Sequence, residues 1–334
     1  MLRGGIGIDN ISGGGGDDTY LFEDDFGLDR INDSEGNNTL DFSLATKQLT
    51  ATVNARGFAV TQGAENEIKG NLTFNRLVMG GGNDLVNITD FGNREIYIDD
   101  KGGNDTYFVR LGRATGSGEN GIINLNDTAG DFDEVIAEQT MKDAIALNQN
   151  QLRNGREVLN YTSDLDRLTV IGRAGKVDGT NILDFGASIT LNNTDNNGIS
   201  RNNSTDVRIV ADKIDFQSQI NADAIIVESL KDINVAQVLN AVANGYVDLR
   251  TYGDKSNISI AAEIKVSTGS SEDGKGSGWV RMVSADGAII NTNGSRIIGS
   301  DAHLMLKAKN GIGSDTAAVI NRGGNVNCCN IAPR

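Results

Sequence analysis

The sequence predicts an all-β protein, a parallel β-solenoid with one or two short helices. Three observations favour this fold class. The chain has 334 residues with 42 glycines, one proline and 5% aromatic residues, a composition suited to short strands joined by tight turns. Apolar and polar residues alternate over most of its length. Gly, Asn and Asp are concentrated between these alternating segments, where turns are expected.

The first 138 residues contain a series of predicted strands. Each has an apolar residue at every second position, so that one face is buried and the other meets solvent. Turn residues separate the strands, and no long helical segment lies between them, which suits a solenoid better than a βαβ sheet. The predicted strands are LDRIND (28–33), NTLDFSL (38–44), LTATVNA (49–55), NLTFNRLVM (71–79), REIYIDD (94–100), TYFVRLG (106–112), GIINLND (121–127) and DEVIAE (133–138).

Two segments have apolar residues at helical spacing and predict short helices. In the segment 139–155, Thr140 is placed as an N-cap and Gly155 as a C-terminal stop. The segment 232–245 has apolar residues three and four positions apart, followed by a glycine. These residues are Val235, Val238, Leu239, Val242 and Gly245.

Two consecutive nonapeptides begin at residue 4. GGIGIDNIS and GGGGDDTYL both fit G-G-x-G-x-D-x-U-x, in which U is a large apolar residue. The glycines permit a tight turn, the Asp supplies a hard oxygen ligand, and the large residue is buried. The predicted metal ligands are Asp9 and Asp18, and the glycines of the turns are Gly4, Gly5, Gly7, Gly13, Gly14 and Gly16.

Incomplete copies of this pattern occur further along the chain. MGGGNDLVN (79–87) keeps Gly82 and Asp84, and DKGGNDTYF (100–108) keeps Gly103 and Asp105. These two copies are also predicted to bind metal. SEGNNTLDF has Asn38 in place of the Asp, and AGDFDEVIA has its Asp at 133; both are predicted to be turns without ions.

The repeats resemble the RTX family, the haemolysin-type calcium-binding repeats of secreted bacterial proteins. The resemblance implies a β-roll with Ca²⁺ held between stacked turns, and it is strong for 18 residues. Because an ion in that family is shared by two stacked turns, Asp9 and Asp18 would need partners from turns outside this sequence or from Asp84 and Asp105. We therefore expect the chain to be a segment of a longer protein.

The last 130 residues resemble the coils of filamentous-haemagglutinin-type exoproteins, which are right-handed parallel β-helices of bacterial adhesins. The resemblance depends on Gly287 with Ile289, the strand 303–308, and the closing turn 311–313. A spacing of 46 residues between ISIAAEIKV and LMLKAKNGI predicts that Ile258 and Leu304 lie in one inward column, two coils apart. The predicted regions are an RTX-like β-solenoid (1–138), a transitional segment (139–204) and a haemagglutinin-like β-helix (205–334).

Charge and composition disfavour several classes of function. The net charge is −15, from 45 acidic and 30 basic residues, which would repel a nucleic acid backbone. The acidity is equally consistent with simple solubility and with carboxylates that bind calcium. The two cysteines, Cys328 and Cys329, are adjacent, so a zinc site is disfavoured. No apolar run is long enough to span a bilayer.

We predict that the protein is not an enzyme. The single histidine, His303, is expected to face outward on its strand. A carboxylate mechanism, as in β-helical polysaccharide lyases and glycan hydrolases, would have two groups of side chains to use, and each is more often a solvated strand edge. These groups are Asp164, Asp166 and Arg167, and Arg208, Asp212 and Lys213.

The sequence therefore predicts a secreted or cell-surface bacterial β-solenoid that binds calcium and acts as a structural or adhesive segment of a large exoprotein. Its expected partners are calcium, a cell-surface glycan and copies of itself. Two alternatives remain: a self-assembling surface-layer or filament subunit, and a glycan-active β-helix enzyme.

Overall fold

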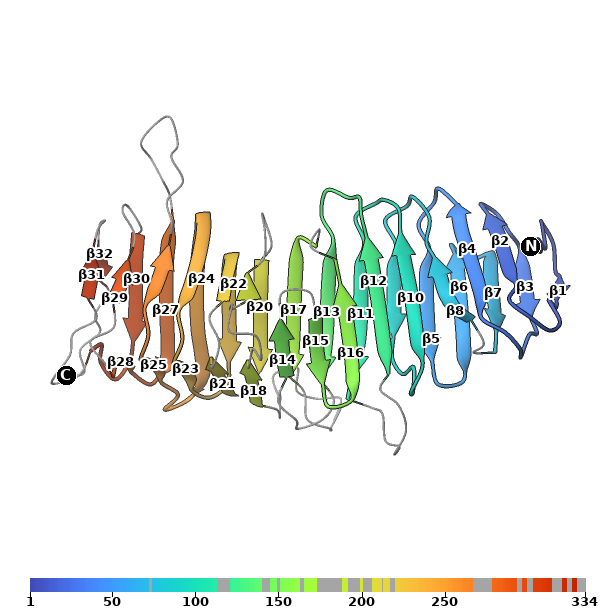
Figure 1. Cartoon of the computed structure of the whole chain (residues 1–334). Helices are drawn as coiled ribbons and strands as arrows, with labels where there is room; N and C mark the ends of the chain where they lie inside the picture. Colours follow the sequence, from blue (N-terminus) through green and yellow to red (C-terminus); the bar gives the residue numbers. More distant parts are fainter. Residues whose placement is uncertain are drawn as a thin grey trace. The chain divides into compact units, whose positions relative to one another are not determined.

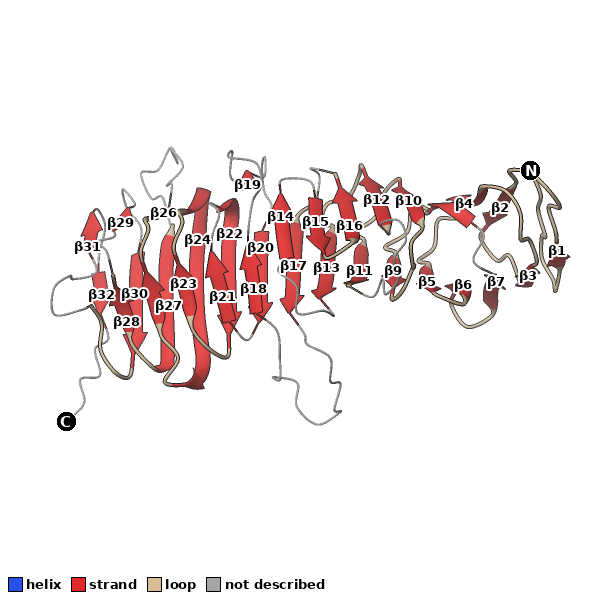
Figure 2. Cartoon of the chain, turned by 60° about the horizontal axis from the view of Figure 1, so that its bottom comes forward, coloured by secondary structure: helices blue, strands red, loops and turns tan. Residues whose placement is uncertain are grey.

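The structure of the chain is all-β. The computed structural model describes residues 1–71, 74–112, 121–139, 145–148, 151–162, 165–172, 188–191, 199–200, 206–211, 213–216, 220–266, 278–292, 296–298, 303–313, 320–322 and 326–328. Every regular element within these ranges is a β-strand, and most strand pairs are parallel (Figure 2). No helix in the described ranges is long and apolar enough to cross a membrane.

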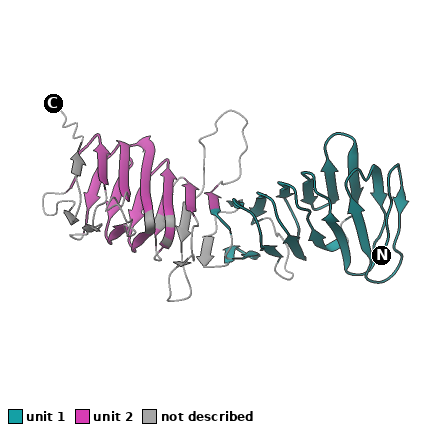
Figure 3. Cartoon of the chain, turned by 90° about the horizontal axis from the view of Figure 1, so that it is seen from above, with its two compact units in different colours: residues 1–138, 150–167 teal, residues 139–149, 168–334 magenta. Residues whose placement is uncertain are grey.

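The chain divides into two compact units (Figure 3). Unit 1 comprises residues 1–138 and 150–167, and unit 2 comprises residues 139–149 and 168–334. The three regions predicted from the sequence stay a prediction.

Unit 1 contains two series of paired strands. In the first series, β2, β4, β8, β10, β12 and β16 pair in parallel in that order, and β15 joins β16 in an antiparallel hairpin. The strands are β2 (Thr19–Glu23), β4 (Asn38–Leu44), β8 (Phe74–Val78), β10 (Glu95–Asp100), β12 (Ile122–Asp127), β15 (Gln151–Asn154) and β16 (Glu157–Tyr161).

The second series of unit 1 is parallel except in its middle. Strand β1 pairs with β3, β3 with β7, β5 with β9 and β9 with β11, all in parallel. Strand β6 lies between β5 and β7 and is antiparallel to both. The strands are β1 (Asn10–Ile11), β3 (Leu28–Ile31), β5 (Thr50–Asn54), β6 (Gly57–Gln62), β7 (Asn66–Gly70), β9 (Leu85–Ile88) and β11 (Thr106–Leu111), and β13 (Glu134–Gln139) follows β12 in the chain.

Alternation along the strands builds the core of unit 1. In β4, for example, Leu40 and Phe42 are buried while Asp41 and Ser43 are half-buried on the other face. Because the strands pair in register, buried residues stack across the first series into one inward column. This column consists of Tyr20, Leu40, Leu77, Ile98, Leu125 and Tyr161.

Unit 2 is built from parallel pairs. One series runs β20, β22, β24, β27, β30 and β32, and these strands lie side by side in Figure 1. A second runs β24, β26, β29 and β31, and a third runs β18, β21, β23, β25 and β28. The strands of the unit are β14 (Ile145–Asn148), β17 (Arg167–Gly172), β18 (Ser188–Leu191), β19 (Ile199–Ser200), β20 (Asp206–Ala211), β21 (Lys213–Phe216), β22 (Ile220–Ser229), β23 (Ile233–Val235), β24 (Leu239–Asp254), β25 (Ile258–Ile260), β26 (Ile264–Val266), β27 (Trp279–Asp286), β28 (Ile289–Asn291), β29 (Arg296–Ile298), β30 (His303–Ala308), β31 (Ile320–Arg322) and β32 (Val326–Cys328).

The core of unit 2 consists of columns of aliphatic side chains. Residues two apart on each strand of the first series point inward and align with their counterparts on the next strand. Burying such a column contributes about 1.5–3 kcal/mol for each side chain. The two columns are Val207, Ile225, Val247, Val280 and Leu304, and Ile209, Val227, Leu249, Met282 and Leu306.

The helix predicted at 232–245 is wrong. Residues 233–235 form β23, and the rest of the segment from Leu239 onward is the start of β24. The segment also contains alternation, because Ile233 and Val235 are buried in β23, and Leu239 and Ala241 are buried in β24. In the first predicted helix, residues 145–148 and 151–154 are also strands, and the N-cap Thr140 lies outside the described residues.

The predicted stacking of Ile258 on Leu304 is also wrong. Both side chains are buried, but Ile258 pairs with Ile289 in the third series, whereas Leu304 pairs with Val280 in the first. The 46-residue spacing therefore joins two different strand series. His303 is exposed, as the alternation predicted.

Candidate metal centre

Aspartates that precede strands form a row of stacked turns in unit 1. Asp84, Asp105 and Asp133 stand immediately before β9, β11 and β13. The backbone N–H of Asp84 donates to Oδ1 of Asp105 (2.6 Å), and that of Asp105 donates to Oδ1 of Asp133 (2.9 Å). The N–H of Asp133 in turn donates to Oδ2 of Asp166 (2.7 Å). Each carboxylate therefore ties its turn to a neighbouring turn.

The alternation of the strands directs these aspartates inward. Asp105 stands two positions before buried Tyr107, and Asp84 two positions before buried Val86, so each Asp has the inward orientation of its strand. A Cβ added to Gly103 would lie 2.0 Å from the carbonyl oxygen of Gly82. Only glycine permits the turns to approach this closely, which explains the G-x-D-x-U order.

Two further aspartates, from the first strand series of unit 1, lie close to the aspartates of these turns. Asp100 and Asp127 end β10 and β12 and are paired in register. Both are buried. The hydroxyl of Tyr107 lies 2.9 Å from Oδ2 of Asp100 and 2.8 Å from Oδ2 of Asp127. Since the hydroxyl has one proton to donate, it can hydrogen-bond to only one of these two carboxylates at a time.

The five aspartates form two groups that share Asp105. One group is Asp84, Asp100 and Asp105, and the other is Asp105, Asp127 and Asp133. Within each group, carboxylate oxygens lie within 4.8 Å of one another. Calcium binds oxygen at about 2.3–2.6 Å. Two oxygens on opposite sides of one calcium ion are therefore about 5 Å apart, which is close to the oxygen–oxygen limit within these groups. The arrangement can hold a cation.

Burial makes the charged form of this cluster unfavourable without a cation. Asp105 is 1% exposed, and its Oδ2 has no hydrogen-bond partner within the described part of the chain. Burial, followed by repulsion from nearby carboxylates, raises the pKa of Asp105 to about 8 and that of Asp100 to about 7. Burial also raises the pKa of Asp84 and of Asp133 to about 6.

The N-terminal repeats lie outside both groups. Asp9 and Asp18 are half-buried, and their N–H groups donate to Oδ1 of Asp29 (3.0 Å) and Oδ1 of Asn38 (2.9 Å). Among the described residues, only Asp84 and Asp105 of the predicted ligands fall in a three-carboxylate group. A Cβ added to Gly13 would lie 2.2 Å from Oδ2 of Asp18, so a larger residue there would displace this carboxylate.

Asp100, Asp127 and Asp133 belong to the two carboxylate groups but were not among the predicted ligands. A signal was available for Asp127, because it continues the inward alternation of Ile123 and Leu125 along β12. A carboxylate at an inward position is costly unless it is paired or neutralised. Its proximity to Asp105 depends on the pairing of strands, which the sequence pattern does not reveal.

Of the residues considered for a glycan-active enzyme, those with described side chains take part in other contacts. Asp166 accepts the backbone hydrogen bond from Asp133, and the guanidinium of Arg167 lies 5.0 Å from the ring centre of Phe132. Arg208 pairs with Glu228. Asp164 and Asp212 lie outside the described residues, and the placement of the Lys213 side chain is not described.

Fold and site together define an all-β protein of long, mostly parallel strand series with a buried carboxylate cluster that could hold a metal ion. No protein-family model matches the chain, and neither a curated protein nor a solved structure matches it. The resemblances to RTX repeats and to haemagglutinin-type exoproteins therefore stay predictions.

Proposed function

We propose that the chain is a calcium-binding β-solenoid segment of a secreted or cell-surface exoprotein, with a structural or adhesive role. The observation that carries the proposal is Asp105, a buried carboxylate shared by two groups of aspartates. An all-carboxylate donor set favours a hard cation such as Ca²⁺ over zinc or copper. Binding would stabilise unit 1 by mass action.

The strand pairing supports the solenoid part of the proposal. Asp206, Ala224, Tyr246 and Trp279 are consecutive partners across parallel strands, so the chain returns to the same series after each excursion. Crossovers between parallel strands of one sheet are right-handed in about 98% of cases. A right-handed coil is therefore the expected path.

A surface cleft supports access of the ion to the cluster. The cleft has a volume of about 540 Å³ and is lined by Asp100 together with Asp41, Arg76, Asp99 and Lys101, among others. Asp100 thus borders both the cleft and the carboxylate cluster. We expect the cation to enter on this side.

Calcium titration of the chelator-stripped chain tests the proposal. Isothermal titration calorimetry should show saturable binding, and saturating calcium should raise the melting temperature. At a free concentration 100 times the Kd, the gain would be about 2.7 kcal/mol. Magnesium measured in parallel identifies which hard cation is preferred.

The variant Asp105→Asn tests whether Asp105 is needed for calcium binding without preventing the chain from folding. The amide oxygen can still accept the N–H of Asp84, so the variant should fold but lose calcium binding. Asp131→Asn is the matched control, because Asp131 is an exposed carboxylate in the neighbouring turn. Equal calcium binding by the two variants, or identical melting of the wild-type chain with and without a chelator, would contradict the proposed cation site at Asp105.

A further inference from the structure

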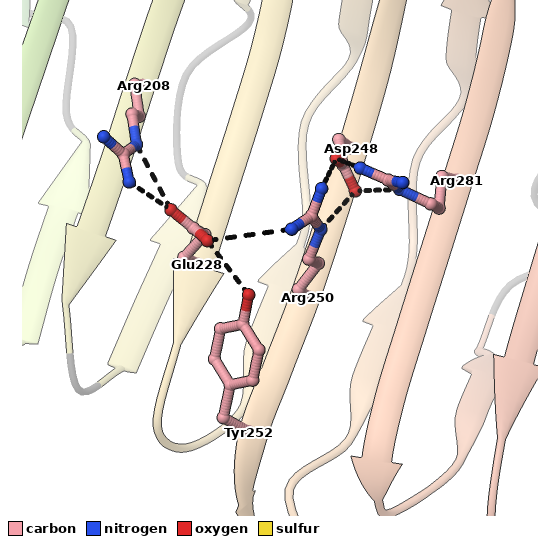
Figure 4. Close-up of polar contacts among 6 residues, drawn as sticks. All are labelled: Arg208, Glu228, Asp248, Arg250, Tyr252 and Arg281. Atoms are coloured by element: carbon pink, nitrogen blue, oxygen red, sulfur yellow. Dashed lines mark hydrogen bonds and ion pairs between the residues drawn. The ribbon is translucent and has the colours of Figure 1, made fainter. Parts of the chain in front are cut away.

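One outward face of unit 2 has a connected set of charged side chains (Figure 4). They lie on β20, β22, β24 and β27, which are neighbours in the first series of the unit. We call this set the arginine face. It consists of Arg208, Glu228, Asp248, Arg250, Tyr252 and Arg281.

Strand register assembles the arginine face. Arg208, Asp248 and Arg281 are in one row across the strands, and Glu228 and Arg250 are partners in the next outward row. Arg208 donates to Oε2 of Glu228 (2.7 Å), and Arg250 donates to Oδ1 and Oδ2 of Asp248 (3.0 and 2.5 Å). Arg281 also donates to both oxygens of Asp248, one of them at 2.9 Å.

The acids of this face are covered and the guanidinium groups are open to solvent. The side chain of Asp248 is 2% exposed and that of Glu228 is 18% exposed, whereas that of Arg208 is 45% exposed. The side chains of Arg250 and Arg281 are each about one-third exposed. In Figure 4 one terminal nitrogen of Arg208 points away from Glu228. The carboxylates thus fix the guanidinium groups while N–H donors remain available.

An aromatic pair and a lysine extend the face. Tyr246 and Trp279 are stacked with ring centres 4.3 Å apart and planes 7° apart, and the guanidinium of Arg281 lies 5.0 Å from the Trp279 ring centre. Lys307 is exposed on β30, two strands from β24. The three arginines and Lys307 thus lie together on a chain of net charge −15, with Glu228 and Asp248 as the acids that hold the arginines.

We propose that the arginine face, with Lys307, binds a polysaccharide that has a carboxylate on every second sugar. Arg208, Arg250 and Lys307 are on β20, β24 and β30, each two strands from the next. Parallel strands are about 4.8 Å apart, so these three cations are on strands about 10 Å apart, close to the length of a disaccharide in an extended chain, and Arg281 is on the strand between β24 and β30. Planar guanidinium groups match carboxylates in bidentate geometry.

The same surface is poorly suited to single-stranded nucleic acid. Bases bind to protein chiefly by stacking on open aromatic faces. Here the rings of Tyr246 and Trp279 cover one another, and Arg281 lies over Trp279. A sugar carboxylate needs the guanidinium groups rather than an open ring face.

Trp279, the one tryptophan of the chain, allows a direct test in the full-length protein. Titration with hyaluronan oligosaccharide should change its fluorescence in a saturable manner that weakens with salt. Neutral maltooligosaccharide, dextran sulfate and oligo(dT) are the comparison probes. Hyaluronan should bind more tightly than all three. No response to hyaluronan, or tighter binding of dextran sulfate or oligo(dT), would overturn the proposal.

Two substitutions locate the binding site. Arg208→Gln with Lys307→Gln should weaken hyaluronan binding roughly tenfold. Lys307→Gln alone should weaken it less, and it removes no ion pair of the arginine face. Lys309→Gln, the same change on the exposed turn after β30, should have no effect. Equal affinity of wild type and the double variant, with unchanged circular dichroism, would contradict the assignment.

This inference is independent of the proposed cation site. Asp105→Asn, in unit 1, should leave hyaluronan binding unchanged while abolishing calcium binding. Loss of hyaluronan binding in Asp105→Asn would show that the two sites are not separate, and would count against the arginine face as the binding surface.

Discussion

The two units treat buried carboxylates in opposite ways. In unit 1, Asp105 lies among other aspartates, faces inward, and has one oxygen without a hydrogen-bond partner among the described residues. In unit 2, Asp248 is equally buried but faces the outer side of its sheet, where Arg250 and Arg281 cover it. Asp105 immediately precedes β11, and Asp248 lies within β24; in both strands, side chains two positions apart are buried.

The difference shows where each unit obtains its positive charge. A buried carboxylate is costly unless it is neutralised or fully hydrogen-bonded. In unit 2, Arg250 of the same strand and Arg281 of the neighbouring strand β27 supply guanidinium groups to Asp248. In unit 1, Asp105 has no ion pair with Lys or Arg among the described residues, so a proton or a cation from solution is what would neutralise it.

The largest expected effect is a pH dependence of unit 1 in the presence of a chelator. The folded-state pKa values of Asp84, Asp100, Asp105 and Asp133 are about 6 to 8, above the unfolded value of about 3.9. The folded state therefore binds more protons, and stability falls as pH rises from about 4 to about 8. The total loss should be several kcal/mol, since one pKa unit corresponds to about 1.4 kcal/mol.

Hydrogen exchange at a series of pH values measures this effect for each unit. Unit 2 should change less than unit 1 between pH 5 and 8: burial raises the pKa of Asp248, but the hydrogen bond and charge of Arg250 offset part of that shift. Burial raises the pKa of Glu228, but hydrogen bonds from Arg208 and Tyr252 outweigh burial, so the net shift is downward. Calcium should reduce the loss in unit 1. A pH dependence of similar size in both units would contradict the comparison.

Removing both cations of Asp248 should be the next largest effect. Arg250→Leu with Arg281→Leu leaves a buried carboxylate without compensation and should destabilise unit 2 by about 3 kcal/mol. Urea unfolding followed by Trp279 fluorescence measures the change. Addition of Asp248→Asn should recover much of the loss. If the triple variant is no more stable than the double variant, the charge of Asp248 is not the cause.

Tyr107→Phe should have an intermediate effect on unit 1. The hydroxyl is the donor that Asp100 and Asp127 share, and its loss should cost about 1–2 kcal/mol in chelator. Thermal unfolding followed by circular dichroism measures the change. Tyr97→Phe is the control, because Tyr97 is 43% exposed and donates to exposed Glu95. An equal effect of both substitutions would show that burial of the acceptors is irrelevant.

The smallest expected effect is at a half-exposed ion pair of unit 1. Arg76 lies 2.7 Å from Asp99, and its side chain is 54% exposed. Arg76→Gln should cost at most about 0.5 kcal/mol. Arg110→Gln should cost more, because its partner Glu138 has a side chain only 5% exposed. Urea unfolding of both variants would contradict this ranking if Arg76→Gln were the more damaging.

Much of the local structure could be predicted from the sequence. Alternation correctly placed most strands and the outward position of His303. It was misread at 232–245, where residues three and four positions apart also include an alternating set, and the paired strands around this segment decide in favour of β24. Local pattern cannot make that choice, because the hydrogen-bond partners are distant in sequence.

The metal cluster could be predicted only in part. Asp84 and Asp105 are recognisable from G-x-D-x-U, whereas Asp100 and Asp127 reach them through a second series of strands. The stacked turns are separated by 21, 28 and 33 residues, so no fixed repeat identifies which turns are neighbours. Longer loops cost little additional free energy, and the spacing is therefore free to vary.

The sequence by itself determined the strand character of the chain and which side chains face inward, because both follow from alternation with a period of two. The tertiary structure decided which inward carboxylates meet and that Arg281 joins Arg250 at Asp248. Those encounters depend on the pairing and register of strands far apart in the chain. Strand register brings groups of like charge together in unit 1, which raises the cost of burying them, and brings groups of opposite charge together in unit 2, which lowers that cost.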